Sequence, residues 1–416
     1  MTVAVSREAS ANVVREATSE ARPRGARLDY VDALRVVLIL LVVAHHSIEA
    51  YVARHPPEIV LPDDPIPRAW VFLAVNAGFF MGLFFFLAGY YTPGAFDRKG
   101  TRQFVADRFT RLGIPFLLGV LLVVPLSNWM RMATYPGMPH VGYWEYAARD
   151  FLGIGTRPDY WPEAERWPQV NFGPMWFVEH LLVYALLYAA WRALMPRRAN
   201  AAEPAPPTGL AIFAYAVALS LATYVTRIWY PQDRWIAFLG FIQMEPGHLP
   251  QYASLFVIGL IAGRGRWIET MPRPRGLKWL AVGLALAALL YTMVGFGLVG
   301  GGSPTHAPPT VGGLKLPDWQ PIVWESFLCT ALCVGLPVAF RELALGAGRL
   351  WQVLARNVLA IYVFHFPFVF AVQVALTHTD LSKWSRMLLT WPAAVLITVA
   401  FTNYVILRLP GLRRVF

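Results

Sequence analysis

The sequence predicts an all-α fold: a polytopic membrane bundle of about ten transmembrane helices with both termini on the cytosolic side. Three observations lead to it. The 416 residues are 56% hydrophobic and 15% charged, whereas a soluble domain is nearer a quarter charged. Apolar runs recur along the chain, each close to the ~20 residues that cross a bilayer. Basic residues concentrate in every second segment between these runs. The composition therefore excludes a soluble globular enzyme.

Ten apolar runs have near-spanning length. Their approximate ranges are 33–54, 68–91, 112–130, 174–195, 209–229, 250–265, 278–300, 320–340, 353–376 and 387–407. The run at 250–265 is the shortest. Residues 1–27 are polar, so we expect a disordered cytosolic tail followed by a membrane domain at 28–416.

The basic residues set the orientation of the spans. If both termini are inside, the inner segments hold 25 of the 36 Lys and Arg residues, a consistent positive-inside bias. Topology thus accounts for the net charge of +11, and nucleic acid is not an expected partner. Membrane lipids are the expected surroundings, and nothing in the sequence indicates the oligomeric state. Cys329 and Cys333 lie in one apolar run and are expected to be packing residues, with no metal site.

The first apolar run carries ionisable residues at bilayer depth, where such groups are usually functional. At ~100° per residue, His46 falls about 20° from Arg35, Glu49 about 40° and Asp32 about 60°, so the four share one stripe. His45 lies about 80° from Arg35, which favours His46 as the working histidine. Arg35 and His46 are about 16 Å apart along the axis, so a ligand that touches both is long. The alternative is a polar seam that holds helices together.

A basic pair precedes the third apolar run. Arg108 and Arg111 are three residues apart and lie on one face of a helix. Guanidinium groups suit phosphate oxygens because they bind them bidentately. Plain anchoring of the topology is the alternative interpretation.

Three further positions stand out. Trp176 and Glu179 lie at the outer start of the fourth run, and His365 lies inside the ninth, two residues before a proline. His248 is expected to be a surface histidine. The segment 131–173 is rich in Tyr and Trp, which favours either an interfacial belt or a platform for sugar rings.

These residues together resemble the acyltransferase-3 family of integral membrane O-acyltransferases, most closely the glucan biosynthesis protein C branch. The resemblance covers about residues 28–408 and rests on five motifs in the family's order. They are Arg35 with His46 after ten intervening residues, Arg108 with Arg111, Phe84-Phe85-Phe86, Trp176-Phe177-Val178-Glu179 and Tyr362-Val363-Phe364-His365. Some relatives carry an extra hydrolase-like domain, which we do not expect here because the sequence ends at Phe416.

The resemblance implies a multi-pass enzyme of the bacterial inner membrane that transfers an acyl group from cytosolic acyl-CoA to a hydroxyl of a sugar, glycan or related acceptor. His46 is then the general base, with a covalent acyl-histidine as the alternative. Glu49 orients the imidazole or holds the acceptor. Arg35, Arg108 and Arg111 bind the donor. Acyl-CoA is a substrate, and thioester chemistry needs no metal.

The remaining residues of the pattern have less defined roles. Asp32 is expected to pair with Arg35 and set its direction. Trp176, Glu179 and His365 are assigned as acceptor-binding or structural residues.

Two other functions remain as alternatives. A proton-coupled secondary transporter would use Arg35, His46 and Glu49 as a relay, although the sequence shows none of the internal repeats typical of many transporters. A haem membrane protein would use His46 and His365 as axial ligands, and the purified protein would be coloured.

Overall fold

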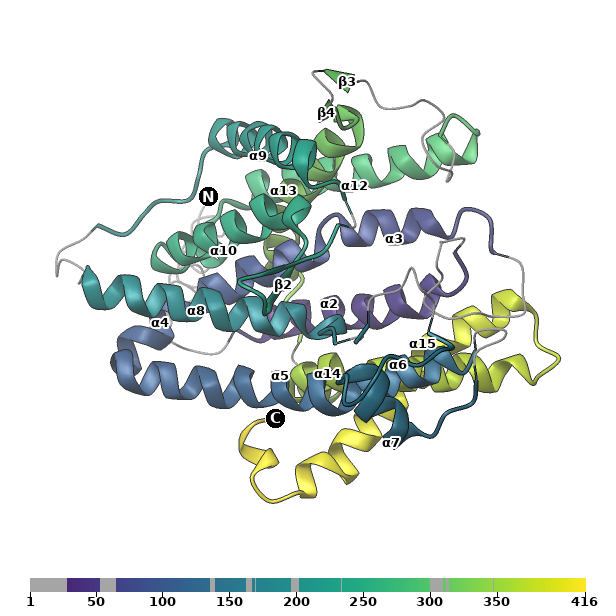
Figure 1. The fold of residues 1–416 in the computed structure, drawn as a ribbon. Coiled ribbons are helices and arrows are strands. Elements are labelled where there is room, and N and C mark those ends of the chain that lie inside the picture. Colours follow the sequence, from purple (N-terminus) through teal and green to yellow (C-terminus); the bar gives the residue numbers. More distant parts are fainter. Residues whose placement is uncertain are drawn as a thin grey trace, which may run out of the picture.

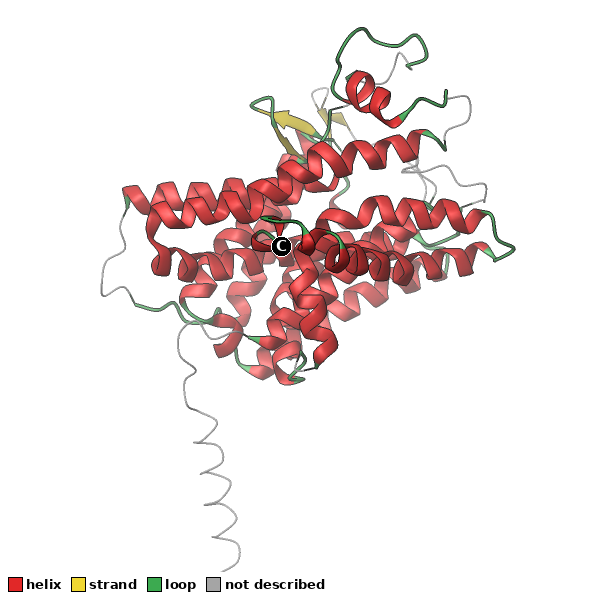
Figure 2. Cartoon of the chain, turned by 90° about the horizontal axis from the view of Figure 1, so that it is seen from below, coloured by secondary structure: helices red, strands yellow, loops and turns green. Residues whose placement is uncertain are grey.

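The computed structural model describes residues 28–52, 65–134, 139–161, 167–168, 170–195, 202–232, 234–299, 310–311, 314–346 and 348–416. The predicted tail at 1–27 lies outside this part. The described chain is a bundle of helices with two short β-hairpins, so the all-α fold class is confirmed (Figures 1 and 2).

The long helices are α2 (Asp29–Glu49), α4 (Phe80–Arg108), α8 (Trp176–Leu194), α9 (Gly209–Trp229), α10 (Leu249–Arg264), α12 (Arg273–Gly295), α13 (Trp319–Glu342), α14 (Arg349–Thr377) and α15 (Lys383–Tyr404). The shorter helices are α3 (Trp70–Ala77), α5 (Ile114–Leu118), α6 (Val124–Met132), α7 (Tyr143–Glu145) and α11 (Trp267–Thr270).

Single helical turns are η1 (Phe109–Gly113), η2 (Gly119–Val123), η3 (Tyr146–Phe151), η4 (Gly173–Met175), η5 (Pro246–His248), η6 (Ile406–Arg408) and η7 (Leu412–Arg414). Strand β1 (Ile236–Phe238) pairs antiparallel with β2 (Ile242–Met244), and β3 (Thr310–Val311) pairs likewise with β4 (Leu314–Lys315).

Eight helical stretches of the described chain are long and apolar enough to cross a membrane, against about ten predicted runs. The difference has two causes. The second and third predicted runs fall in one helical stretch, Trp70–Met132, which turns back at Gly100 (φ 70°). The sixth run is α10, whose 16 residues are short for a span. Each predicted run overlaps a helix of the described chain. Figure 1 shows the chain turning back beside the α4 label.

The core is organised around α2, which is buried along most of its length and packs against α13, α14 and α15. Helices α4 and α10 approach each other closely because both carry glycine at their contact. A Cβ at Gly89 would lie 2.2 Å from the Phe256 carbonyl oxygen, and one at Gly259 would lie 2.3 Å from that of Phe86. Small residues allow the two backbones to approach closely. Such close packing holds helices together in a membrane, because the hydrophobic effect does not favour helix–helix contacts over contacts with lipid. Cys329 and Cys333 are buried, as expected of packing residues, and both are free cysteines.

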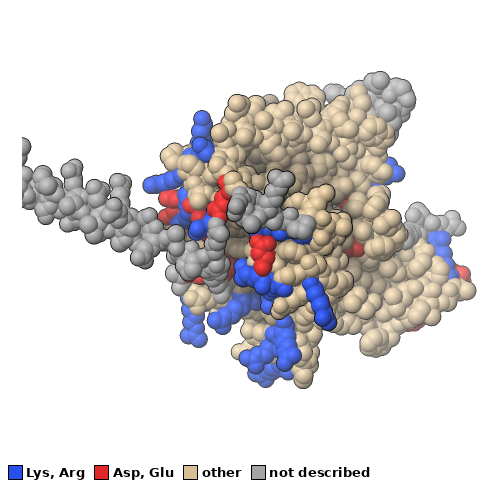
Figure 3. All heavy atoms as spheres, turned by 90° about the vertical axis from the view of Figure 1, so that its left-hand side faces the viewer, with Lys and Arg blue, Asp and Glu red and all other residues tan. Residues whose placement is uncertain are grey.

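Lys and Arg side chains gather on the end of the bundle where α4 turns back (Figure 3). This is the distribution that the positive-inside rule predicts for the cytosolic face.

Candidate active site

Helix α2 brings its four ionisable residues together in pairs. Arg35 Nη1 lies 3.4 Å from Asp32 Oδ1, and His46 Nδ1 lies 3.0 Å from Glu49 Oε2. The His46 side chain is 21% exposed and that of Glu49 only 9%. Because Nδ1 faces a carboxylate, we assign the proton to Nδ1, which leaves the lone pair on Nε2 of His46.

His46 and Glu49 line a cavity of about 740 Å³, here called the histidine pocket. Its walls come from the C-terminal half of α2, from α3, from the start of α8 and from the β1–β2 hairpin. The Trp, Tyr and Phe side chains in these walls are Trp70, Phe80, Trp176, Trp235, Tyr252, Tyr362 and Phe366. A cavity with many aromatic faces and several amide and charged groups suits a polar ring-shaped ligand.

Helix α3 ends at Ala77 and α4 begins at Phe80, so the second predicted run is interrupted beside the pocket. Buried Asn76 donates a hydrogen bond to the Leu41 carbonyl oxygen (3.1 Å) and ties this break to α2. His45 also lines the histidine pocket, although its phase places it off the Arg35 stripe. Its ring stacks on Phe80 at 5.5 Å between centroids. The pocket therefore wraps around two faces of α2, which the helical phase alone did not indicate.

The segment 131–173 lines the histidine pocket, but with residues other than its Tyr and Trp side chains. It contributes Arg131, Val170, Asn171 and Gly173. Tyr146 and Trp161 are buried, and Trp144 is 78% exposed. None of the described aromatic side chains of 139–168 lines this pocket, so the predicted sugar platform there is not part of it.

His365 of α14 lies against His46, with 5.3 Å between the ring centroids. Its Nδ1 lies 2.8 Å from the Tyr362 carbonyl oxygen, so Nδ1 donates and Nε2 is the acceptor. Nε2 is buried and has no hydrogen-bond partner among the described residues. From the same helix, Gln373 donates to the Ser47 carbonyl oxygen (3.1 Å) and fixes α14 on α2.

Trp176 and Glu179 have different surroundings. Trp176 lines the histidine pocket and stacks on Tyr252, with 5.4 Å between centroids. Glu179 is buried, and its Oε2 accepts a hydrogen bond from the Gln243 backbone N–H (3.1 Å). The Gln243 side chain in turn accepts one from the Phe172 backbone N–H (2.8 Å). Glu179 thus fastens the β1–β2 hairpin to the start of α8 and does not itself line the pocket.

The expectation that His248 is a surface histidine is wrong, because its residue surface is only 7% exposed. Its Nδ1 lies 2.8 Å from Glu245 Oε2, and its Nε2 lies 2.8 Å from Glu325 Oε1. Glu325 also accepts from Arg227 (2.8 Å). With a carboxylate at each ring nitrogen, the imidazolium form is favoured. Burial lowers the pKa of His248, but the two glutamates outweigh burial and raise it to about 9.

A second cavity, of about 470 Å³, is here called the arginine pocket. Arg35, Arg108, Arg111 and Arg356 all line it. Arg111 lies in a π-helical turn and is held by Asp107 (3.1 Å). The two arginines predicted from their spacing therefore do converge with Arg35.

The arginine pocket also shows what sequence reasoning missed. No spacing pattern pointed to Arg356 of α14, which adds a fourth arginine to the wall, and Phe416 also lines it. The Arg108 Nε is buried without a hydrogen-bond partner among the described residues. An arginine with unused donors beside three others is a site for an anionic ligand such as phosphate.

Tyr362 lines both cavities. It comes from α14, and its hydroxyl donates a hydrogen bond to the Pro174 carbonyl oxygen at the start of α8. The two pockets therefore meet at one side chain: Arg35 lies in one and His46 in the other, about 16 Å apart along α2.

These features define a membrane helix bundle with a basic cavity at one end and a histidine–carboxylate cavity toward the other. The chain matches the model of the acyltransferase-3 family, described as an acyltransferase domain, over residues 28–406. It belongs to that family and is a multi-pass membrane acyltransferase. No curated protein and no solved structure matches the chain.

Proposed function

We propose that this acyltransferase moves an acyl group from acyl-CoA to a hydroxyl of a carbohydrate or related acceptor, where the two pockets meet. One observation carries the proposal: the arginine pocket and the histidine pocket share Tyr362 as a wall. A donor whose charged end and reactive end lie far apart fits this arrangement, because it can occupy the arginine pocket while its thioester reaches toward His46.

The arginine pocket suits the phosphates of acyl-CoA. Arg35, Arg108, Arg111 and Arg356 provide forked donors, and Phe84 and Leu87 provide apolar walls for the pantetheine arm. Arg108 and Arg111 of this pocket follow the turn of α4, and Lys and Arg gather at that end of the bundle (Figure 3), as expected for a cytosolic donor.

The histidine pocket holds the acceptor in this proposal. Stacking on Trp70, Trp176 and Trp235 suits a sugar ring, and side chains such as Asn171 and Gln243 suit its hydroxyls. His46 Nε2 removes the proton from the acceptor hydroxyl, whose oxygen attacks the thioester carbonyl carbon. The carbon–oxygen bond forms, the carbon–sulfur bond breaks, and the imidazolium returns its proton to the leaving CoA thiolate.

Glu49 has a defined part in this step. Its carboxylate 3.0 Å from Nδ1 holds the tautomer that exposes Nε2, and it stabilises the imidazolium that forms. His365 provides a neutral neighbour at 5.3 Å between centroids rather than a second charge. Asp32, paired with Arg35, sets the direction of that guanidinium toward the donor.

The cellular setting follows from the same interpretation. We place the protein in the bacterial inner membrane with both termini cytosolic, near the glucan biosynthesis protein C branch of the family. The acceptor is then a cell-envelope carbohydrate. Mass spectrometry of envelope glycans from cells with and without the gene identifies the acceptor and the acyl group.

The purified protein tests the mechanism directly. CoA release is followed with acyl-CoA and a mixture of sugar acceptors. We expect His46→Ala to lower turnover about 10²–10⁴-fold while acyl-CoA binding is kept, because only the base is lost. His45→Ala should keep most turnover, because its ring stacks on Phe80 and is not the partner of Glu49.

Two results would contradict the assignment. A folded His46→Ala protein with wild-type turnover removes His46 as the base. A loss of activity in proportion to a lower melting temperature shows that His46 only holds helices together.

A further inference from the structure

A third cavity opens between α8 and α10, outside both pockets of the active site. This α8–α10 groove has a volume of about 660 Å³. Its apolar lining includes Tyr184, Leu187, Trp191, Val257, Leu260 and Ile261. Leu187 is 62% exposed, Trp191 51% and Val257 52%, so the groove opens on the outside of the bundle. In a membrane protein that side faces the lipid chains.

One end of the groove is basic. Arg192 lies in the last turn of α8, and Arg264 is the last residue of α10. Both helices begin at the histidine pocket, so their C-terminal ends lie together at the opposite, basic end of the bundle. That level is the boundary between the hydrocarbon and the headgroups, where lipid phosphates lie.

The two arginines differ in how they are neutralised. Arg264 donates to Asp97 through both of its terminal nitrogens and also to the Tyr188 hydroxyl (3.1 Å). Within the described residues Arg192 forms no ion pair, and its Nε is buried without a hydrogen-bond partner. Its guanidinium lies 5.8 Å from the centre of the Phe96 ring. The groove therefore ends at an arginine that forms no ion pair with the described residues.

We propose that the α8–α10 groove binds an anionic phospholipid, with an acyl chain along the groove and the phosphate on Arg192. Charge complementarity supports this occupant: a half-buried arginine with unused donors stands at the head of an apolar channel at headgroup depth. The proposal does not depend on the transfer reaction.

The geometry favours a membrane lipid over the acyl chain of the donor. Phe256 lines both the groove and the arginine pocket, and its ring packs on Tyr184 at 5.2 Å between centroids. These rings form a wall between the two cavities. A lipid in the groove lies against the outer side of that wall.

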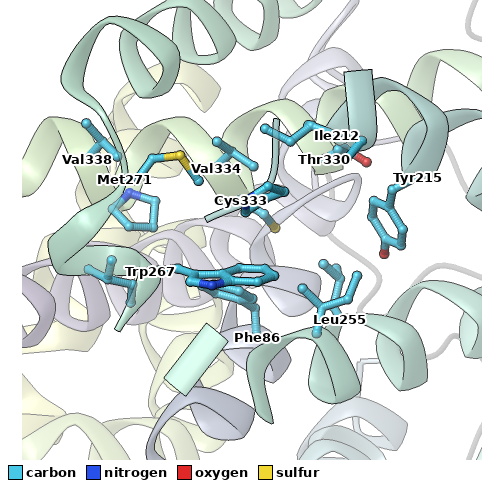
Figure 4. Close-up of a pocket in the computed structure, with 15 residues that line it drawn as sticks. Phe86, Ile212, Tyr215, Leu255, Trp267, Met271, Thr330, Cys333, Val334 and Val338 are labelled. Atoms are coloured by element: carbon cyan, nitrogen blue, oxygen red, sulfur yellow. The ribbon is translucent and has the colours of Figure 1, made fainter. Parts of the chain in front are cut away.

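A smaller apolar cavity lacks the basic end that the α8–α10 groove has. It measures about 150 Å³ and lies between α9, α11 and α13, where Tyr215, Trp267 and Cys333 enclose it (Figure 4). No charged side chain lines it. It offers nothing to a phosphate, whereas the α8–α10 groove joins an apolar channel to an arginine.

Native mass spectrometry of the full-length protein, stripped of lipid in a neutral detergent, tests the proposal. Phosphatidylglycerol and phosphatidylcholine with identical chains are titrated separately. We expect phosphatidylglycerol to bind at least about tenfold more tightly. Arg192→Gln should remove that preference, and Arg192→Lys should keep part of it. Val257→Trp, which fills the groove, should weaken both lipids.

The matched control is Arg102→Gln, which removes an exposed arginine that lines neither the groove nor the active-site pockets. It should bind phosphatidylglycerol as the wild type does. Equal binding of the two lipids, no effect of Arg192→Gln, or an equal loss in Arg102→Gln would each overturn the proposal. So would full competition by glycerophosphoglycerol, which has no chains.

Discussion

Glu49→Gln is the sharpest test of how the site works, because it removes a charge and almost no volume. The carboxylate lies 3.0 Å from His46 Nδ1 and is 9% exposed, so water screens it little. At an effective dielectric constant of about 20, a unit charge about 4 Å from the imidazolium stabilises it by at most about 4 kcal/mol. Exchanging a charge-assisted hydrogen bond for a neutral one loses about 1–1.5 kcal/mol.

These two figures bracket the expected effect on the reaction. Taking about 2.7 kcal/mol, kcat should fall about 10²-fold, because the charge acts on the imidazolium that forms in the transition state. The KM for acyl-CoA should stay near the wild-type value, since Glu49 lines the histidine pocket and not the arginine pocket. Glu49→Asp should recover part of the rate. The assay is steady-state CoA release.

A second buried carboxylate provides the matched control. Glu179→Gln should lower the thermal stability or raise the acceptor KM with little change in kcat, because Glu179 fastens the β1–β2 hairpin through the Gln243 backbone. If Glu49→Gln behaves as Glu179→Gln does, or keeps the wild-type kcat, Glu49 does not act on the imidazole.

Two further predictions concern the ends of the bundle. Arg108→Gln and Arg356→Gln should each raise the KM for acyl-CoA about 10–100-fold, because each loses about 1.5–3 kcal/mol of charge-assisted hydrogen bonding. The control Arg349→Gln, on an exposed turn of α14, should leave this KM unchanged. If acyl-CoA binding is unchanged in both Arg108→Gln and Arg356→Gln, these arginines only set the membrane topology. The fold raises the pKa of His248 to about 9, from about 6.5 in the unfolded chain. Protonated His248 therefore stabilises the folded protein fully below about pH 6.5, and this stabilisation is lost as the pH rises through 9. The free energy of unfolding should therefore fall over that window by at most about 3 kcal/mol, which appears as a lower melting temperature. His248→Gln should abolish this fall. A wild-type melting temperature that does not change with pH over this window would refute the reasoning.

The sequence alone determined the membrane fold and much of the polar stripe on α2. Apolar runs of spanning length predict helices because backbone groups in lipid must bond within their own segment. The phase of a single helix is local geometry, so the pairs formed by Asp32 with Arg35 and by His46 with Glu49 follow from their spacing. The same spacing placed Arg108 beside Arg111.

Only the tertiary structure decided what these residues meet. Arg356 reaches the arginine pocket and His248 meets Glu325 because segments far apart in the sequence pack together. No periodicity within one helix encodes such contacts. Helix packing likewise made Tyr362 the shared wall of two cavities and left Arg192 at the head of an apolar groove. Spacing along the chain fixes neighbours on one helix, whereas a cavity is defined by the distances between helices.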